Sequence, residues 1–311
     1  MLSLPDFKEK QILFIKTERK SDDKIKFWND NIKFTRNGET VNQVSCHKIF
    51  AIFLIGDLSI TSEIIKKCGR YGISIYFLNH SLEEYASIAP ESEGNFLLRT
   101  KQYNFCQELK ISKCLLINKI TNQLTLVKDP KKSIADLVNQ IKKARGNKEL
   151  LGIEGNISKT YFSRMFEDIG WSGRIPRAKI DIQNLLLDIG YYYLFNFIDA
   201  LLRNYGFDVY KGFYHKEFYL RKSLACDIME PFRIIIDRQL IKSYHLKQIK
   251  SSDFICKNGS YQIKTGQSLK YSEFFVSAIL NEKERIHQYV KEFYYFIIGK
   301  RDDFPVFKTK R

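Results

Sequence analysis

The sequence predicts an α+β protein, in which a small N-terminal β domain holding one helix (1–90) precedes a larger all-α domain (91–311). Short apolar runs and alternating apolar and polar residues dominate the first part of the chain, as in strands. The segment Pro90-Glu91-Ser92-Glu93-Gly94 has the composition of a linker. After it, apolar residues recur with the 3.6-residue period of helices. These three observations predict the fold class and the division into domains.

The expected strands of the N-terminal domain are of two kinds. Residues 24–28 and 31–35 alternate with period two and are joined by Asn29-Asp30, which predicts a hairpin of half-buried strands. Residues 49–55 and 73–78 are nearly all apolar, which predicts buried strands. The remaining expected elements are a strand at 11–15, a helix at 61–68 that ends at Gly69, and a short edge strand at 84–88.

The second domain is predicted to be helical because its apolar residues follow the i, i+3, i+4, i+7 rule. The segment from Ile134 to Ile141 is an example, and Gly146 follows as a helix breaker. Proline cannot donate a backbone hydrogen bond, so Pro231 predicts a kink in the helix that contains it. The expected helices span 96–122, 134–145, about 148–166, 182–205, 223–242 and 273–298.

The net charge indicates the kind of partner. Lys and Arg total 51 and Asp and Glu total 35, which gives a formal charge of +16. Excess positive charge attracts polyanions, and nucleic acid is favoured over a membrane because no amphipathic anchor or lipidation signal accompanies the charge. The chain has no run of 18 apolar residues and no secretory signal, so we expect a cytoplasmic protein without membrane contact.

Three polar stretches inside apolar helical surroundings carry the candidate site. Glu154 lies on an apolar helix face, where a carboxylate is costly unless it is paired or binds a cation. His215 lies in a loop, and Asp227 and Glu230 are three residues apart on one helix face. Each stretch also has a purely structural interpretation, namely a surface glutamate at a helix start, a hydrogen-bonding loop histidine and a solvated helix face.

Taken together, the candidate residues predict a divalent metal site. Carboxylate ligands favour Mg²⁺ or Mn²⁺, and one imidazole shifts the preference toward Mn²⁺. On a basic protein, such a site indicates phosphodiester chemistry, in which the cation polarises a phosphoryl oxygen. A zinc hydrolase is less favoured because the sequence contains no HExxH or CxxC motif.

At these residues the sequence resembles the CRISPR-associated integrase family, the larger enzyme of the spacer-acquisition module. The resemblance spans nearly the whole chain, and its specificity lies in the ordered set of motifs rather than in any one of them. The matching pieces are Gly152-Ile153-Glu154-Gly155, Gly212-Phe213-Tyr214-His215, Asp227-Ile228-Met229-Glu230 and Phe232-Arg233.

The resemblance implies a metal-dependent DNA endonuclease and integrase, which joins 3′-OH ends of short foreign DNA to a CRISPR repeat by direct transesterification. It implies that Glu154, His215 and a carboxylate of Asp227 or Glu230 hold the divalent cation, and both of the last two are kept as catalytic candidates. It also implies a homodimer formed through the β domain, with two dimers bridged by the smaller partner protein. Two alternatives remain open, a metal-dependent nuclease acting on branched DNA and a non-catalytic DNA-binding assembly protein.

The double-stranded DNA is expected to contact a basic surface near the metal. Between residues 141 and 180, nine Lys or Arg stand against four Asp or Glu. Any single one of these can be an ordinary solvated residue, so the prediction concerns the set. The expected DNA contacts are Lys142, Lys143, Arg145, Lys148, Lys159, Arg164, Arg174, Arg177 and, after the histidine, Arg221.

Overall fold

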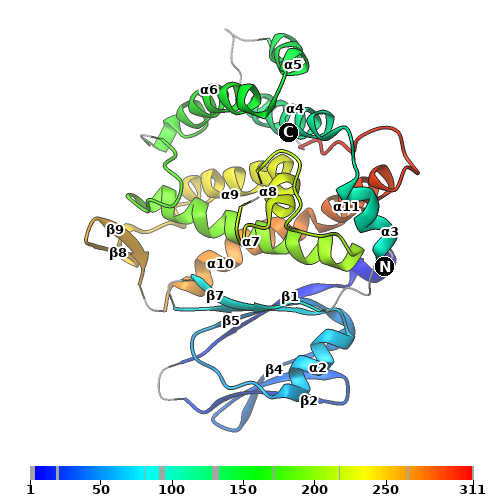
Figure 1. Ribbon diagram of the computed structural model, residues 1–311. Helices are drawn as coiled ribbons and strands as arrows, with labels where there is room; N and C mark the ends of the chain where they lie inside the picture. The colour runs from blue at the N-terminus through cyan, green and yellow to red at the C-terminus, as the bar shows by residue number, and fades with distance from the viewer. Residues whose placement is uncertain are drawn as a thin grey trace. The chain divides into compact units, whose positions relative to one another are not determined.

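The computed structural model describes residues 4–18, 21–80, 82–90, 95–127, 133–169, 171, 173–216, 218–264 and 266–309 (Figure 1). The chain divides into two compact units, Met1–Gly94 with Ile263–Glu273, and Asn95–Gln262 with Phe274–Arg311. Ile263–Glu273 therefore groups with the N-terminal unit, whereas the sequence placed it in the helical domain. Residues 91–94 of the expected linker lie outside the described residues.

The N-terminal unit contains two sheets. The four-stranded sheet has the order β1 (Gln11–Lys16), β5 (Ile49–Ile55), β6 (Ser74–Leu78), β7 (Glu84–Ile88), and the three-stranded sheet consists of β2 (Asp23–Trp28), β3 (Asn31–Arg36) and β4 (Glu39–Ser45). Strands β1, β5 and β6 run parallel, and β7 is antiparallel to β6. The helices of this part are α1 (Leu4–Lys8) and α2 (Ser62–Arg70). The order shows that the chain crosses over through α2 between β5 and β6.

The expected hairpin is confirmed. Trp28 pairs with Asn31, so two residues form the turn. Asn29 and Asp30 have φ of 45° and 57°, which is the left-handed conformation that such turns require. Strand β4 was not predicted, because its residues are mostly exposed and carry no apolar stripe.

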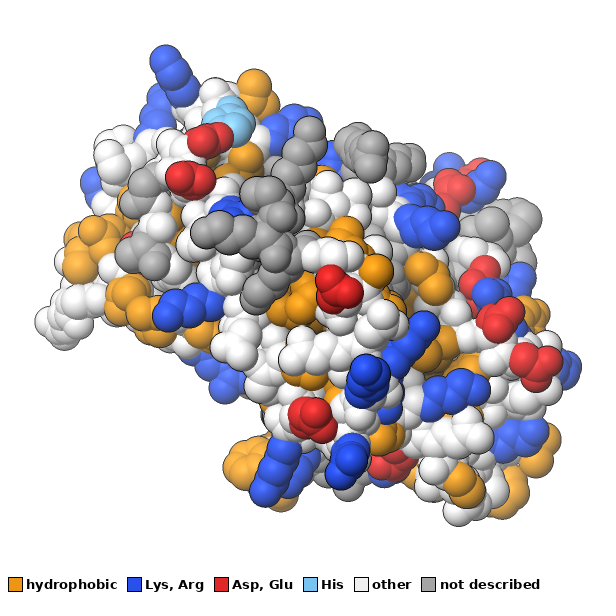
Figure 2. Space-filling model, turned by 90° about the horizontal axis from the view of Figure 1, so that it is seen from above, with side chains coloured by type: hydrophobic (Ala, Val, Ile, Leu, Met, Phe, Trp, Pro, Cys, Tyr) orange, Lys and Arg blue, Asp and Glu red, His pale blue; other side chains and the backbone are white. Residues whose placement is uncertain are grey.

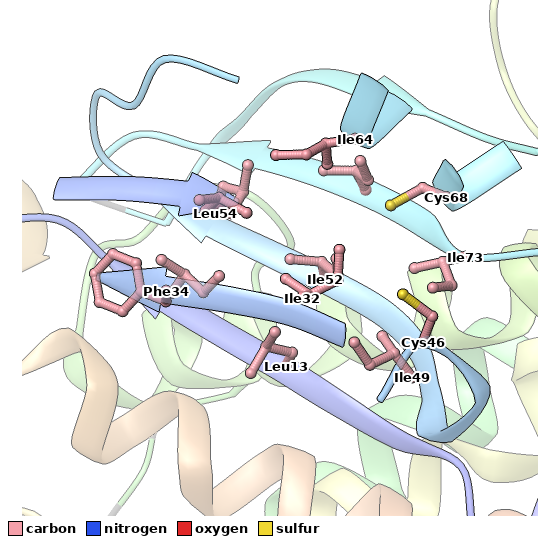
Figure 3. Close-up of a cluster of buried hydrophobic side chains, with 13 residues drawn as sticks. Leu13, Ile32, Phe34, Cys46, Ile49, Ile52, Leu54, Ile64, Cys68 and Ile73 are labelled. Atoms are coloured by element: carbon pink, nitrogen blue, oxygen red, sulfur yellow. The ribbon is translucent and has the colours of Figure 1, made fainter. Parts of the chain in front are cut away.

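The core of the N-terminal unit lies between the two sheets and α2. Every residue of β5 is buried, as predicted for 49–55, because both faces of this central strand are covered. Ile32 of β3 and Leu13 of β1 belong to the same buried cluster as Ile52 of β5 (Figure 3). Ile64 of α2 adds to this cluster, and the Thr61 side chain caps the helix by accepting a hydrogen bond from the Ile64 N–H at 3.4 Å.

The second unit is mainly helical, as expected. Its helices are α3 (Phe96–Tyr103), α4 (Glu108–Leu126), α5 (Ile134–Lys143), α6 (Asn147–Met165), α7 (Ile182–Tyr205), α8 (Ser223–Met229), α9 (Arg233–His245) and α11 (Lys283–Ile297), and α10 (Ser268–Asn281) begins in the segment that groups with the first unit. The segments expected as single helices at 96–122 and 273–298 are each two helices. The kink at Pro231 is confirmed, because a 3₁₀ turn, Glu230–Phe232, separates α8 from α9.

One element corrects the all-α expectation. Strands β8 (Phe254–Lys257) and β9 (Ser260–Ile263) form a two-stranded sheet around Asn258-Gly259. Asn258 and Gly259 have φ of 51° and 74°, so this is the hairpin turn that an Asn-Gly pair favours. The Asn-Gly dipeptide was a readable signal, but each of the strands that it joins has only four residues.

Helix α7 forms the centre of the helical unit. It contacts α8, α9 and α11. A Cβ at Gly190 would lie 2.4 Å from Ile236 Cγ2 of α9, so glycine permits the close approach of these two helices. Helix α7 is long and apolar enough to cross a membrane by length and composition, and 83% of its most apolar stretch is buried within the protein.

Candidate active site

The candidate site is built from helices α4 and α6, the loop after Gly212, and the turn between α8 and α9. Helix α4 contacts both α6 and the 3₁₀ turn. Lys119 of α4 therefore reaches Glu154 of α6 and Glu230 of the turn. The tight turn at Pro231 directs the Glu230 side chain inward, where it is 3% exposed.

The Lys119 ammonium bridges the two carboxylates. Lys119 Nζ donates a hydrogen bond to Glu154 Oε1 and lies 2.6 Å from Glu230 Oε2. Burial alone would lower the pKa of Lys119, but the charges of Glu230 and Glu154 outweigh it and raise the pKa above its ordinary value. The lysine is therefore charged at neutral pH, and it acts as a cation held between two anions.

Glu230 is ionised by its cationic neighbours. Arg233 Nε donates to Glu230 Oε1 at 2.9 Å. Burial acts to raise the pKa of the Glu230 carboxyl, but Arg233, Lys119 and His215 together lower it to about 2. His215 follows Tyr214 in the loop, and its ring centroid lies 5.2 Å from that of the tyrosine that donates to Glu154. The Glu230 carboxylate is thus available as an anionic ligand at any physiological pH.

Asp227 organises the loop that carries His215. Its Oδ2 accepts hydrogen bonds from the N–H groups of Phe213 and Tyr214, at 2.6 and 2.9 Å. Its Oδ1 accepts from the His215 N–H at 2.8 Å and lies 2.7 Å from His215 Nδ1. Because a carboxylate only accepts hydrogen bonds, the imidazole carries a proton on Nδ1, and Nε2 is the ring nitrogen left to bind a ligand.

Gly212 and Tyr214 complete the positioning of this loop. A Cβ at Gly212 would lie 2.8 Å from Ser223 Cβ and 2.9 Å from Asp227 Oδ2, so only glycine lets the loop pass close to α8. The Tyr214 hydroxyl donates to Glu154 Oε2 and joins the loop to α6. Burial and the Glu154 charge raise the pKa of Tyr214, so the hydroxyl stays protonated as a donor.

The structure places the four predicted ligands in two pairs. Glu154 and Glu230 meet at Lys119, whereas the Asp227 carboxylate bonds to the loop backbone and to His215. The two pairs are linked through Tyr214, which precedes His215 and donates to Glu154. Within the part of the chain that the structure describes, no three His, Cys, Asp or Glu side chains converge closely enough to hold a metal ion as they stand. The expectation that Glu154, His215 and a carboxylate of Asp227 or Glu230 hold one ion therefore stays a prediction.

The donor set nevertheless fits a divalent cation. Two carboxylates and one neutral imidazole nitrogen are ligands that Mg²⁺ and Mn²⁺ accept. Among the described residues, Glu230 Oε2 is a buried oxygen with no hydrogen-bond donor in suitable geometry, although it contacts Lys119. A buried carboxylate oxygen without a well-aligned hydrogen-bond donor has lone pairs that can coordinate a metal ion. Lys119 would have to move for a divalent ion to sit between the carboxylates.

A second buried network holds α6 in place. The hydroxyls of Tyr161 and Tyr191 donate to the two oxygens of Asp237, at 2.8 and 2.5 Å. These bonds tie α6 to α7 and α9 two turns beyond Glu154. Burial raises the pKa of the Asp237 carboxyl to about 6, although the two tyrosines act to lower it. Asp237 is therefore a positioning group for the helix that carries Glu154.

The predicted DNA contacts fall into two groups. Five of them are exposed on α5, α6 and the segment between these helices, namely Lys142, Lys143, Arg145, Lys148 and Lys159, and Arg177 is exposed beyond α6. Arg174 has an internal role, because its guanidinium bonds to Asn184 and Asp188 and lies over the Tyr191 ring at 5.4 Å. Arg164 and Arg221 are half-buried. On the face shown in Figure 2, Lys and Arg side chains lie among hydrophobic and acidic ones rather than in one continuous patch.

Sequence reasoning missed the residues that position the ligands. Lys119 was not considered, although Lys119, Asn122 and Gln123 are polar residues among the apolar ones of α4 and are all buried. Buried polar residues on an apolar helix face were the same signal that identified Glu154. Arg233 and Tyr214 stood in the quoted motifs but received no role.

Comparisons with known proteins match most of the chain. A family model described as "CRISPR associated protein Cas1" matches residues 19–275. A "CRISPR-associated endonuclease Cas1 1" of Thermodesulfovibrio yellowstonii is 29% identical over 277 residues, which cover 81% of this chain and 87% of the relative. A "CRISPR-associated endonuclease Cas1 2" of Rhodospirillum rubrum is 25% identical over 294 residues, 85% of each chain.

Solved structures share the fold. A Cas1 protein from Thermotoga maritima superposes with a TM-score of 0.81 at 18% identity, covering 97% of this chain and all of the other. A "Casposase bound to integration product" gives a TM-score of 0.82 at 19% identity, covering 95% of this chain and 92% of the other. The family model covers well over half of the sequence and includes every candidate ligand. The chain therefore belongs to the Cas1 family of CRISPR-associated proteins.

Proposed function

We propose that this chain is a CRISPR adaptation integrase, a metal-dependent DNA endonuclease that inserts short foreign DNA into a CRISPR repeat array. The observation that carries the proposal is the Lys119 ammonium held between Glu154 and Glu230, with Glu154 also bonded to Tyr214 of the loop that carries His215. It identifies a buried place where two carboxylates already bind a cation. Membership in the Cas1 family supports the proposal, as do relatives named endonucleases and a similar structure named for its integration product.

We assign the divalent cation to Glu154, Glu230 and Nε2 of His215. Mg²⁺ or Mn²⁺ in this place would supply a Lewis acid that polarises a phosphoryl oxygen and stabilises the charge developing on it. Asp227 is a positioning residue in this proposal, because its lone pairs are engaged by the loop. Asp227 holds the His215 Nδ1 proton, so Nε2 is the ring nitrogen to which we assign the role of ligand.

The reaction exchanges one phosphodiester for another. The 3′-oxygen of the incoming strand bonds to a phosphorus of the repeat, one bridging P–O bond of the repeat breaks, and the hydroxyl proton passes through solvent to the departing oxygen. The number of phosphodiester bonds does not change, so no nucleotide hydrolysis is needed. The protein contributes alignment, since the Tyr214 hydroxyl donates to Glu154 and fixes its orientation.

The DNA and protein partners follow the same proposal. The exposed basic residues of α5 and α6 would contact the phosphates of double-stranded DNA, both the spacer precursor and the repeat. We propose a cytoplasmic homodimer formed through the N-terminal unit, with two dimers bridged by the small partner protein. Structures similar in fold carry the titles "Cas6-RT-Cas1--Cas2 complex" and "Crystal structure of TtCas1-DNA complex".

A strand-transfer assay tests the proposal. A duplex with free 3′-OH ends is incubated with a supercoiled plasmid carrying the repeat, in Mg²⁺ or Mn²⁺, and joined products are counted. Glu154→Ala and His215→Ala should abolish joining and leave duplex binding within a few-fold of the wild type. The control is Glu167→Ala, which removes an exposed carboxylate just beyond α6 and should retain activity.

Other outcomes would separate the alternatives. A wild-type protein that cuts branched DNA but never joins a 3′-OH duplex to the plasmid would be a nuclease and not an integrase. Full joining activity in both Glu154→Ala and His215→Ala would refute the metal assignment. Binding without either cleavage or joining would point to an assembly protein.

A further inference from the structure

The segment that follows α11 packs as a strap over the helical unit. In Figure 1 it runs from the end of α11 to the side of α4. Residues 304–309 form no helix or strand, yet Phe304 and Phe307 are buried, at 9% and 3% exposure, whereas Val306 between them is 62% exposed. We call residues 304–309 the strap. Its buried side chains show that it is a packed part of the unit.

Two asparagines of α4 bind the strap backbone. The Phe307 N–H donates to Asn118 Oδ1 at 2.9 Å, and Phe307 O accepts from Asn118 Nδ2 at 2.6 Å and from Asn122 Nδ2 at 2.9 Å. The Thr309 N–H donates to Asn122 Oδ1 at 2.9 Å. Both asparagines are buried. Buried amide groups are costly without hydrogen-bond partners, so the asparagines hold the strap on α4.

The strap also holds the turn that carries Glu230. The Phe307 ring packs edge-on against the Phe232 ring, with the centroids 4.8 Å apart. Asn122 Nδ2, which bonds to the strap, also donates to Pro231 O at 3.2 Å. Pro231 and Phe232 directly follow Glu230 in the chain. The strap therefore bridges α4 and the turn at the place where these two elements form the candidate site.

Two arginines from other helices complete the attachment of the strap. The Arg285 guanidinium of α11 donates to Lys308 O, and Arg285 Cζ lies over the Phe307 ring, 4.6 Å from its centroid. Arg238 Nη1 of α9 donates to Thr309 Oγ1 at 3.1 Å. The strap thus contacts α4, α9, α11 and the 3₁₀ turn. These contacts give it one defined position beside the candidate site.

Coordination of a divalent ion requires a precise spacing of its ligands. Mg²⁺ demands oxygen ligands at about 2.0–2.1 Å in near-octahedral geometry. Glu154 and Glu230 lie on different elements, so the spacing of their carboxylates depends on how α6 and the turn pack against α4. The strap joins the turn to α4 through residues that are not proposed ligands.

We propose that the strap is a positioning element of the metal site, which holds the Glu230 turn at the distance from α4 that a divalent cation requires. Phe307, Asn118 and Asn122 are its positioning residues. This inference rests on the proposed function for the identity of the cation. An open strap would release the turn and weaken metal binding, and by reciprocity bound metal would hold the strap closed. A strap that only stabilised the helices would open equally often with and without metal.

Isothermal titration with Mn²⁺ tests the effect of the strap on the metal. The informative variant is Phe307→Leu, which keeps an apolar side chain but removes the ring that packs on Phe232. Mn²⁺ should bind about tenfold more weakly to this variant, as expected when a group that orients metal ligands is lost. Duplex binding without divalent ions should stay within a few-fold of the wild type. Val306→Ala is the matched control, because it changes an exposed residue of the same strap and should leave the Mn²⁺ affinity unchanged.

Hydrogen exchange in the wild-type protein tests the reciprocal effect of the metal on the strap. Mass spectrometry follows the backbone amides of 304–309, of which those of Phe307 and Thr309 donate to the asparagines. These amides exchange when the strap opens. Saturating Mg²⁺ should slow their exchange about tenfold or more, because metal that binds the open form more weakly favours the closed form by the same factor. In Glu154→Ala, which lacks a proposed ligand, Mg²⁺ should no longer slow the exchange.

Two results would overturn the positioning role. One is a Mn²⁺ affinity of Phe307→Leu equal to that of the wild type while its strap amides exchange faster. The other is strap exchange in the wild type that is the same with and without Mg²⁺, under conditions where titration shows the metal bound. If Phe307→Leu does not fold, the exchange measurement on the wild type decides alone. Failure of wild-type strand transfer, with the strap protected by Mg²⁺, would count against the proposed function and not against the strap.

Discussion

Lys119→Met is the substitution that most directly probes the proposed cation site. Methionine keeps the length and apolar stem of lysine but removes the ammonium from between Glu154 and Glu230. The three side chains are 8%, 17% and 3% exposed. Removing one partner from a buried ion pair costs about 3–5 kcal/mol, because the remaining charges lose their compensation. At about 2–4 °C per kcal/mol for a unit of this size, the metal-free variant should melt roughly 10 °C below the wild type.

Metal binding should change in the opposite direction. In the wild type, a divalent ion has to displace the ammonium before it meets both carboxylates. In the variant, the two carboxylates already lack a compensating charge in the metal-free state. The divalent ion restores that compensation when it binds, so part of the lost stability is recovered. If half of the smallest expected loss of stability is recovered, about 1.5 kcal/mol, Mn²⁺ should bind roughly tenfold more tightly to the variant than to the wild type. A lysine that merely supports the fold would give weaker or unchanged binding when it is removed.

Isothermal titration with Mn²⁺ measures the affinity, and thermal unfolding with and without Mn²⁺ measures the stability. Lys110→Met is the matched control, because Lys110 is an exposed lysine on the same helix. The control should leave both quantities unchanged. Mn²⁺ binding by Lys119→Met that is no tighter than that of the wild type would refute the exchange of ammonium for metal.

Three further predictions concern the supporting residues. Asp227→Asn should weaken Mn²⁺ binding about 10–100-fold while duplex binding persists, because the amide cannot accept all the hydrogen bonds that orient His215; unchanged titration curves would argue against this role. Burial raises the pKa of Asp237 to about 6, so folding takes up a proton between about pH 4 and 6 and wild-type stability falls there by roughly 3 kcal/mol as the pH rises. The urea midpoint of Asp237→Asn, measured as a function of pH, should not show this decline. A midpoint that falls with pH in parallel with the wild type would contradict the raised pKa of the buried carboxyl. Lys148→Ala should lower the log–log salt slope of duplex binding by about 0.9, whereas Arg174→Ala should lower the melting temperature and leave the slope unchanged.

Short sequence patterns predicted the elements that are determined by residues close together in the chain. The hairpin at Asn29-Asp30, the buried strand β5 and the turn at Pro231 depend on neighbouring residues, and all three are confirmed. The parallel pairing of β1 with β5 could not be predicted in the same way. It joins segments that are far apart in the sequence, and apolar composition alone does not state the direction of a strand.

The candidate site shows the same limit. Spacing and composition identified Glu154, His215, Asp227 and Glu230, and the resemblance placed them in one site. Their different tasks depend on three-dimensional contacts, because the Asp227 carboxylate meets backbone N–H groups while that of Glu230 meets cationic side chains. Both are acidic residues in one short segment, so the sequence gives no basis for the distinction. Lys119 is 35 residues from Glu154, and only the packing of α4 on α6 relates them.

The most direct test of the central claim is an anomalous difference map, recorded at the manganese absorption edge from crystals soaked in Mn²⁺. We predict one strong peak in coordination contact with Glu154, Glu230 and Nε2 of His215, with the Lys119 ammonium displaced and Asp227 still bonded to its loop. A peak coordinated by Asp227 in place of Glu230, or no peak at this position at saturating Mn²⁺, would contradict the account.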